Sequence, residues 1–430
     1  MKLFQQMLVA GATLSLIAPI AAQASDVVNL EEMNSYARST KKSSSRLDSK
    51  TFINEVSEDI ANLKGRVDGL EAKQNEFEAG SFSDTTTLDG KAVFTVGSVD
   101  TEGAKDGVAE GYTGEIVANY TYQMNLNSSF TGDDNLYIRL KSGNHDGWSD
   151  IKTPYNTYIS AANGNGDALK VDKIWYTTPV GERNTIWIGP KIENYYMHAT
   201  TPSIYKPVLK AFTLGGNAAA YGASTSPGAG WAYNAENGFA VSSNFTSQQG
   251  KGAPHGILND ESPTSWATQV GFTKPQYSVS AILNQKYNGW ADSYFQTKDG
   301  KARPGDGSST NIGLRGWWRP ESTGTATPSI SVGYDTSETD ATGNSNTTAY
   351  FVGLTWQDII NADDRIGVAF GQPQKHEDDT VDPFLYEVYY DYKINDSVTV
   401  TPTIFGGTSK NGSGEEVDMT GYLVNTTFKF

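Results

Sequence analysis

Apolar and polar positions alternate one by one along most of the chain, from about residue 88 to the last residue. Tyr277, Val279 and Ala281, for example, alternate with Ser278 and Ser280. A period of two places successive side chains on opposite faces of a β-strand. Many runs are long enough for a tilted membrane-crossing strand of about 9–11 residues, whereas soluble strands usually have about five or six. The pattern predicts an all-β fold, a transmembrane antiparallel β-barrel rather than a soluble sandwich.

Clusters of Asn, Asp, Gly, Ser and Pro separate the alternating runs, and the connections differ in length. Pro275 and Asn395-Asp396 mark tight turns, whereas residues 372–383 form a long acidic connection. Short turns at one end and long loops at the other are typical of membrane barrels, which have an even number of strands in bacteria. We expect about 16 strands within residues 86–430, although residues 195–235 follow no regular period.

Residues 1–24 have the features of a secretory signal peptide. Lys2 is basic, residues 7–20 are apolar with two polar breaks, and residues 22–24 match an A-x-A cleavage site. A short transmembrane anchor is the alternative, which the short apolar core disfavours. Residues 25–51 are polar and are expected to form a linker.

Residues 52–79 follow a different period, with seam positions separated alternately by three and four residues. This is a heptad pattern, and such a narrow seam needs partner helices, so it predicts a short coiled coil that self-associates. The alternative is a single amphipathic helix packed against the barrel. Gly65 and Gly69 each weaken a helix by roughly 1 kcal/mol relative to Ala. The seam consists of Ile53, Val56, Ile60, Leu63, Val67, Leu70, Gln74 and Phe77.

The composition is consistent with a barrel and excludes several classes of function. The chain has no cysteine, which excludes disulfides and thiol chemistry. Its net charge of -16 makes nucleic acid an unfavourable partner. Only 37% of the residues are hydrophobic, yet there are 44 glycines and 23 tyrosines. This balance suits strands that face lipid on one side and water on the other.

The final strand carries the most specific signal in the sequence. Tyr422, Val424, Thr426, Phe428 and Phe430 share one face, and Phe430 ends the chain. A terminal aromatic residue on an alternating strand resembles the insertion signal of bacterial outer-membrane barrels. This implies outer-membrane lipid and the barrel-assembly machinery as partners.

Several segments together resemble a known family. They are residues 384–402 (FLYEVYYDYKINDSVTVTP), residues 425–430 (NTTFKF), residues 366–373 (IGVAFGQP), and residues 63–77 leading into residues 87–96. With these segments the chain resembles cyanobacterial outer-membrane porins of the OprB-like, carbohydrate-selective family. Typical cyanobacterial members carry an S-layer-homology domain that grips the cell wall, and the N-terminal region here is too short for one. Contact with the cell wall through this region is therefore left open.

No arrangement of residues indicates catalysis, a cofactor or a metal. None of the four histidines forms a metal-spaced pair. His145 and His376 fall in predicted loops and are expected to be solvated. Acidic pairs such as Asp133-Asp134 lack the spaced ligands of a calcium loop and are interpreted as turn formers. We therefore expect a protein that is not an enzyme.

Alternate positions of a strand face opposite sides, so the odd or even position of each charged residue indicates whether its side chain points into the barrel. These candidates are mostly basic, which suggests an acidic vestibule over a narrower, partly basic constriction. The alternative is that wall charges merely pair across neighbouring strands. Trp317 could stack against a sugar ring or belong to an aromatic girdle at the membrane interface. The pore-lining candidates are Glu115, Arg139, Lys141, Lys173, Arg315, Trp317, Arg365, Glu387, Asp391 and Lys393.

The sequence thus predicts an outer-membrane porin, a homotrimer that passes small hydrophilic solutes such as ions, nutrients and, by the resemblance, carbohydrates. A structural alternative is a tether that links the barrel to the cell wall through the N-terminal coiled coil. An enzymatic alternative, a secreted polysaccharide hydrolase, would need paired carboxylates that the sequence does not reveal.

Overall fold

The computed structural model describes residues 63–67, 81–83, 85–102, 114–145, 158–216, 220–222, 224–249, 256–290, 307–340, 346–410 and 416–430. The chain divides into two units, residues 1–74 and residues 75–430. The predicted signal peptide, the linker and most of the coiled coil lie outside the described residues. Residues 63–67 are helical, with Leu63 56% and Val67 49% exposed. This single turn does not test the seam, so the coiled coil stays a prediction.

In the second unit the described residues form strands and two short 3-10 helices, and none of the described helices is long and apolar enough to cross a membrane. The strands are β1 (Ser81–Ser83), β2 (Thr86–Glu102), β3 (Val117–Ser128), β4 (Asn135–Gly143), β5 (Lys170–Val180), β6 (Asn184–Ile192), β7 (Ser226–Asn234), β8 (Phe239–Ser247), β9 (Thr264–Lys274), β10 (Tyr277–Tyr287), β11 (Ser309–Trp318), β12 (Ser329–Thr339), β13 (Thr347–Gln357), β14 (Arg365–His376), β15 (Phe384–Lys393), β16 (Val398–Lys410) and β17 (Glu416–Lys429).

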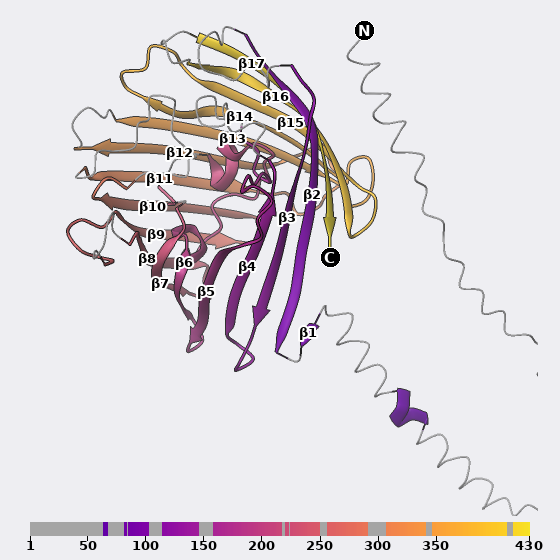
Figure 1. Ribbon diagram of the computed structural model, residues 1–430, viewed down its shortest axis with the longest axis vertical. Coiled ribbons are helices and arrows are strands. Elements are labelled where there is room, and N and C mark those ends of the chain that lie inside the picture. The colour runs from indigo at the N-terminus through magenta and orange to yellow at the C-terminus, as the bar shows by residue number, and fades with distance from the viewer. Residues whose placement is uncertain are drawn as a thin grey trace, which may run out of the picture. The chain divides into compact units, whose positions relative to one another are not determined.

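The strands close into a barrel (Figure 1). Each strand from β2 to β16 pairs antiparallel with the next, and β17 returns to pair with β2, from Asp418 opposite Glu102 to Lys429 opposite Lys91. β1 only adds a short pairing at the start of β2. β2–β17 therefore form a closed antiparallel barrel of 16 strands, which confirms the predicted fold and strand number.

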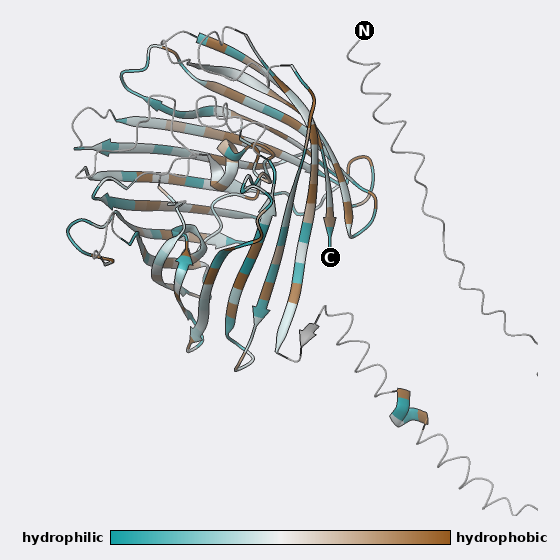
Figure 2. Ribbon diagram, in the orientation of Figure 1, coloured by the Kyte–Doolittle hydropathy of each residue, from teal (hydrophilic) through white to brown (hydrophobic). Residues whose placement is uncertain are grey.

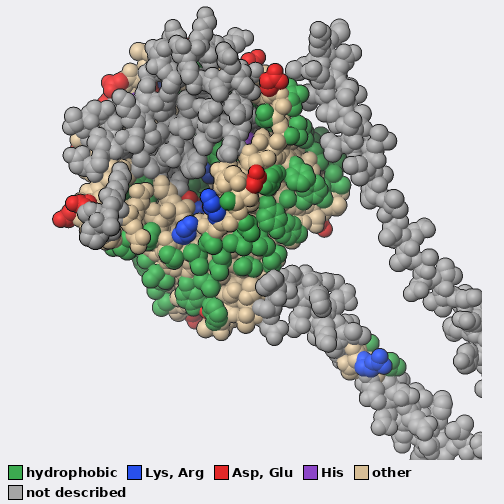
Figure 3. Space-filling view, in the orientation of Figure 1, with side chains coloured by type: hydrophobic (Ala, Val, Ile, Leu, Met, Phe, Trp, Pro, Cys, Tyr) green, Lys and Arg blue, Asp and Glu red, His purple; other side chains and the backbone are tan. Residues whose placement is uncertain are grey.

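Alternation along each strand separates an apolar outer wall from a mostly polar interior. In β10 every second residue is exposed, from Tyr277 to Tyr287, and every residue between them is buried. The exposed set includes Val279 and Leu283, and the buried set includes Asn284. The strands in Figure 2 accordingly carry short alternating hydrophobic and hydrophilic bands, and the outer face of β2–β5 in Figure 3 is a broad hydrophobic surface. This is the polarity of a barrel surrounded by lipid.

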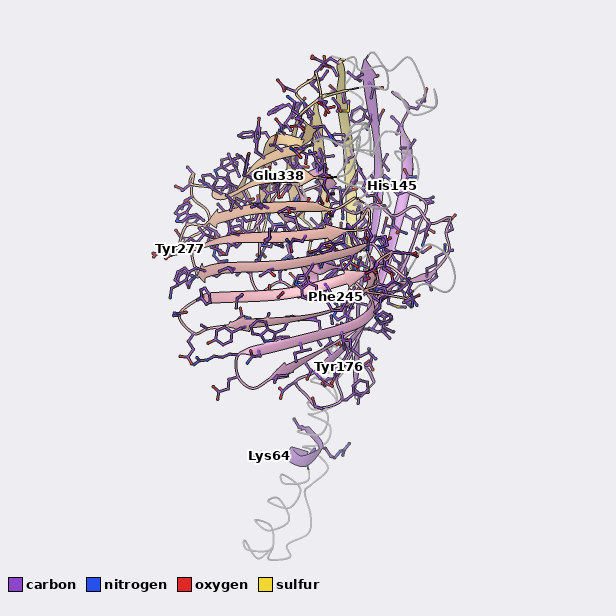
Figure 4. The ribbon with its side chains drawn as sticks, turned by 90° about the vertical axis from the view of Figure 1, so that its left-hand side faces the viewer. Lys64, His145, Tyr176, Phe245, Tyr277 and Glu338 are labelled. Atoms are coloured by element: carbon purple, nitrogen blue, oxygen red, sulfur yellow. The ribbon has the colours of Figure 1, made fainter. Side chains whose placement is uncertain are left out.

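From β2 to β11 the connections are short at one end of the barrel and long at the other, whereas from β11 to β17 the connections at both ends have four to ten residues. Residues 275–276 join β9 to β10, and Figure 4 places Tyr277 at this edge. Gly238 (φ 98°) allows the sharp turn between β7 and β8. At the opposite end, residues 193–225 connect β6 to β7. The predicted alternation of short and long connections is thus present in the first part of the barrel. Residues 372–383, expected to form a long connection, instead include the end of β14, and only residues 377–383 join it to β15.

The predicted insertion face of β17 lies on the outer wall. Phe428 packs against Phe94 of β2, with ring centroids 5.2 Å apart, and Phe430 stacks on Tyr122 at 5.9 Å. Tyr422 and Val424 share this face, whereas Leu423 between them is only 2% exposed. Gly90 lies against the ring of Phe430, where a Cβ atom would come within 2.6 Å of it. The terminal aromatic residue therefore packs on the outer wall where β17 pairs with β2 and closes the barrel.

A charge in the middle of the outer wall should destabilise the barrel in lipid. Leu314 is 50% exposed in the middle of β11, between Ala281 and Tyr334 of the adjacent strands. Arginine near the bilayer midplane costs about 2–4 kcal/mol, against about 0–1 near the interfaces. Leu314→Arg should therefore lower the free energy of unfolding from lipid vesicles, measured by denaturant titration, far more than Thr310→Arg on the same face at the strand end. Equal effects of the two variants would contradict the assigned outer face.

Candidate functional site

A long connection folds into the barrel. Residues 193–225, here called the inner segment, contain the 3-10 helices η1 (Asn194–Met197) and η2 (Lys210–Gly215). Described residues of the inner segment bond to wall residues of strands from β5 to β15, and Figure 1 shows η1 and η2 inside the ring of strands. Sequence reasoning found no regular period in residues 195–235. Described residues of the inner segment pack inside the barrel, which explains the first part, whereas residues 226–234 form strand β7 of the wall.

The first part of the inner segment is held by side-chain amides. The Asn194 side chain is fully buried, donates to Asn244 Oδ1 (2.8 Å) and accepts from Thr246 Oγ1 (2.8 Å). The backbone N–H of Thr200 donates to Gln269 Oε1 (2.9 Å). These bonds satisfy polar groups that would be costly to bury alone.

A buried carboxylate holds the middle of the inner segment. Glu387 of β15 is fully buried. Its Oε1 accepts from Tyr205 Oη (2.9 Å) and Val208 N (3.1 Å), and its Oε2 accepts from Leu209 N (2.6 Å). None of the described lysines or arginines forms an ion pair with Glu387. The carboxylate therefore binds the segment itself and does not pair with a charge on a neighbouring strand.

Apolar packing surrounds this carboxylate. The Tyr205 ring lies 5.6 Å from Phe351 and 6.0 Å from Tyr389, measured between ring centroids. Leu209 is fully buried and forms a β-bridge with Ile159 of the β4–β5 connection. A hydrophobic core thus fills part of the barrel interior and fixes the inner segment against β13–β17.

The last part of the inner segment is held by an arginine. Arg315 of β11 is 4% exposed and forms an ion pair with Asp335 of β12 (2.9 Å). Its Nε donates to the carbonyl of Leu214 (2.8 Å). Trp317, 8% exposed, donates from Nε1 to the carbonyl of Thr201 (3.0 Å). Arg315 and Trp317 point inward as expected, but both anchor the segment.

The inward-facing charges that stay partly exposed lie mainly elsewhere on the wall. One row crosses four adjacent strands: Lys429 is opposite Lys91, Lys91 is opposite Gln123, and Gln123 is opposite Lys141. Directly opposite residues share a face of the sheet. These lysines have the parity of Val93, which is 2% exposed, and not that of the outward-facing Phe94. Lys429, Lys91 and Lys141 are called the lysine row below.

A second row contains Arg139, whose guanidinium is held in place. Arg139 is opposite Asn125 on one side and Lys173 on the other. Its Nε donates to Asn125 Oδ1 (3.2 Å) and its Nη1 to Tyr196 Oη of η1 (3.1 Å). The guanidinium also lies over the Tyr137 ring at 5.4 Å. Aromatic rings therefore orient a cation here and do not present open faces to a sugar.

The inner segment adds two more lysines. Lys206 is exposed, and the positive charge of Arg365 lowers its pKa, as does burial. Burial lowers the pKa of Lys210, and the charges of Lys173 and Arg139 lower it further. Since like charges disfavour one another's charged form, the shift at Lys206 indicates crowded positive charge, whereas that at Lys210 comes first from burial and is opposed by Glu193.

Most predicted pore-lining residues face inward, with two differences. Glu115 precedes β3 and is exposed, so it is not part of the wall. Lys393 has inward parity but lies at a turn, where it pairs with Asp363 (3.2 Å) and Asp396 (3.0 Å). Arg365 and Asp391 pair with each other at 3.3 Å, as the cross-strand alternative predicted. The expectation that His145 is solvated is wrong, because it is 2% exposed.

Sequence reasoning missed four lysines. Lys91 and Lys429 have the same inward parity as the predicted candidates and could have been found by the same rule. Lys206 and Lys210 lie in the irregular stretch, where no period assigns a face.

Solved structures with a similar fold are outer-membrane proteins. OmpT of Vibrio cholerae lacking loop L8 aligns with a TM-score of 0.50 and 12% identity over 80% of this chain and 99% of that chain. In-vitro folded OmpT of the same organism, described as a trimer form, aligns with a TM-score of 0.50 and 13% identity over the same shares of each chain, 80% and 99%. At such identities the likeness concerns the fold alone. The fold is that of a porin-like outer-membrane barrel.

Sequence comparison identifies the family. The model described as "Carbohydrate-selective porin, OprB family" matches residues 47–405. An uncharacterized protein of Nostoc sp. is 26% identical over 428 residues, 87% of this chain and 71% of that protein. An uncharacterized protein of Synechocystis sp. is 28% identical over 141 residues, 33% of this chain and 25% of that protein. The chain belongs to the OprB family of carbohydrate-selective porins, and it is an outer-membrane channel protein and not an enzyme.

The Glu387 contacts predict a variant with a wider channel. Glutamine has one acceptor oxygen, so Glu387→Gln turns an NH₂ group toward at least one N–H or O–H donor of the inner segment. Each lost hydrogen bond to a charged group costs about 1.5–3 kcal/mol. We expect higher and noisier single-channel conductance in planar bilayers.

The matched control for this variant is Glu338→Gln, an exposed position on the outer face of β12. It should conduct like the parent protein. Unchanged conductance of a folded Glu387→Gln barrel, with folding checked by heat-modifiable gel mobility, would show that Glu387 does not position the inner segment.

Proposed function

We propose that the chain is exported by its signal peptide and forms a passive diffusion channel for small hydrophilic solutes, with a preference for anions. The observation that carries the preference is the lysine row, together with Lys206 and Lys210. None of these five lysines has an ion-pair partner among the described residues. The more deeply buried wall charges, by contrast, are used to hold the inner segment.

The selectivity follows from electrostatics in a confined space. Two unit charges 4 Å apart interact by about 1 kcal/mol in bulk water and about 4 kcal/mol at an effective dielectric constant of 20. A narrowed channel with protein walls lies between these limits, so a few unpaired cations bias which ions enter. No chemical step is involved, because solutes diffuse through water and the wall charges set their relative flux.

The assembly proposed for the chain is a homotrimer. The proposal is supported by a protein of similar fold, OmpT of Vibrio cholerae, which is described as a trimer form. Purified protein in detergent should have about three times the mass of one mature chain, which is 46.5 kDa less the signal peptide, when measured by light scattering with the detergent contribution subtracted. A mass of one chain under several mild detergents would count against a trimer.

The anion preference can be measured from the reversal potential of purified protein in a planar bilayer under a KCl gradient. Chloride moving to the dilute side faster than potassium makes that side negative, so we expect a negative potential there. Replacing Lys91 and Lys429 together by Glu should move the potential toward positive values, because it reverses two unpaired charges on the channel wall.

The control is Lys274→Glu, which changes the same charge at the end of β9 beside Phe272, on the outer wall. It should leave the potential close to that of the parent protein. A parent channel that makes the dilute side positive would refute the anion preference, and a folded protein without any channel activity would favour the tether instead.

A further inference from the structure

Four cationic side chains converge where the inner segment meets β4 and β5. Arg139 and Lys141 lie two residues apart on the inward face of β4, and Lys173 of β5 is opposite Arg139. The inner segment reaches this place because Tyr196 of η1 accepts from Arg139 and Glu193 accepts from Lys173. Lys210 lies within electrostatic range of Arg139, Lys141 and Lys173. These four cationic residues are called the basic cluster.

Two carboxylates of the described residues form ion pairs with the basic cluster, and a third, Asp89, accepts from the Asn125 amide that also binds Arg139. Lys173 forms a short ion pair with Glu193 (2.6 Å), and Arg139 lies 3.9 Å from Asp172. Four cations against these two carboxylates leave an excess of two positive charges. Lys141 and Lys210 are the cations left without an ion-pair partner in the described part of the chain, and one belongs to the wall while the other belongs to the inner segment.

The guanidinium of Arg139 is already oriented. Bonds to Asn125 and Tyr196 use Nε and Nη1, and no described contact uses Nη2. The Tyr137 ring lies beside the guanidinium plane. A planar fork held in this way loses little further freedom when it binds an anion.

We propose that the basic cluster is a transient binding site for a small divalent oxyanion, such as hydrogen phosphate or sulfate, on the solute path of the porin. The proposal rests on the anion preference proposed above and names a class of solute for it. The excess of two charges matches a dianion. Its several oxygens can accept from more than one cation, and Lys141 and Arg139 belong to the wall while Lys210 belongs to the inner segment.

Other solutes fit the basic cluster less well. Chloride carries one charge and cannot bridge several separated donors. A neutral sugar would leave the excess charge uncompensated.

The test measures block of chloride current by oxyanions through the full-length protein in a planar bilayer. Inorganic phosphate at pH 8 and sulfate are added to KCl at constant ionic strength, with nitrate as the singly charged comparison. We expect phosphate and sulfate to reduce the current saturably, and nitrate to have far less effect. Lys141→Gln and Lys210→Gln should each raise the half-blocking concentration by about tenfold or more, since each removes a charged hydrogen-bond donor.

Two further variants separate binding from a change in pore shape. Lys210→Arg retains the charge and should be blocked by phosphate and sulfate nearly as strongly as the parent protein. If Lys210 acted only by its shape, Lys210→Arg and Lys210→Gln should both weaken the block. The current through Lys274→Gln, a variant on the outer wall, should be blocked by phosphate and sulfate at the same concentrations as in the parent protein.

Each outcome bears on one proposal. A channel that prefers chloride over potassium but shows no saturable block by phosphate or sulfate would overturn the oxyanion site and leave the proposed function standing. A channel that prefers potassium would overturn the proposed anion preference itself. Equal block by nitrate and sulfate would also contradict the site, because charge matching would then play no part.

Discussion

Lipid cannot hydrogen-bond to a peptide group, so every backbone N–H and C=O in the membrane must be bonded within the protein. A sheet meets this requirement only when it has no free edge, and the pairing of β17 with β2 removes the last edge. Closure then fixes which side each side chain takes, since successive residues in a strand point to opposite faces. The apolar outer wall, the polar interior and the place of the terminal Phe430 all follow from that closure.

The interior repeats the same requirement on a smaller scale. The inner segment has little regular structure, so many of its backbone groups depend on side chains of the wall. Glu387 accepts from the backbone of Val208 and Leu209, Arg315 donates to the carbonyl of Leu214, and Gln269 accepts from Thr200. Wall polarity on these strands is therefore used to hold the segment. The wall on which charges have no such task remains for solutes. Its charges without an ion pair in the described part of the chain are the lysines of the lysine row and Asp89, which accepts from Asn125 and Asn127.

Alternation was enough to predict the barrel, its 16 strands and the outward face of β17. In a closed barrel the odd or even position of a residue in its strand decides whether its side chain faces lipid or the interior. It also identified Arg139, Lys141 and Lys173 as inward, and the same rule extends to Lys91 and Lys429. Parity cannot say what a residue does once it is inside. Glu387 was expected to line the pore and instead binds the inner segment, since its partners come from a stretch without a period. For the same reason no pattern in the sequence could reveal Lys206 or Lys210.

The net charge of -16 is a poor guide to the channel, because acids and bases have different tasks along the chain. Asp134 accepts from the backbone of Phe130 and Thr131, and Asp364 accepts from that of Ile359 and Ile360, so both stabilise turns at the short end of the barrel. Carboxylates in such turns are fixed by the backbone. An acidic protein can therefore enclose a basic passage. We propose that the charge that matters for selectivity is the excess left on the wall after the inner segment has been bound, and that the lysine row makes this excess positive.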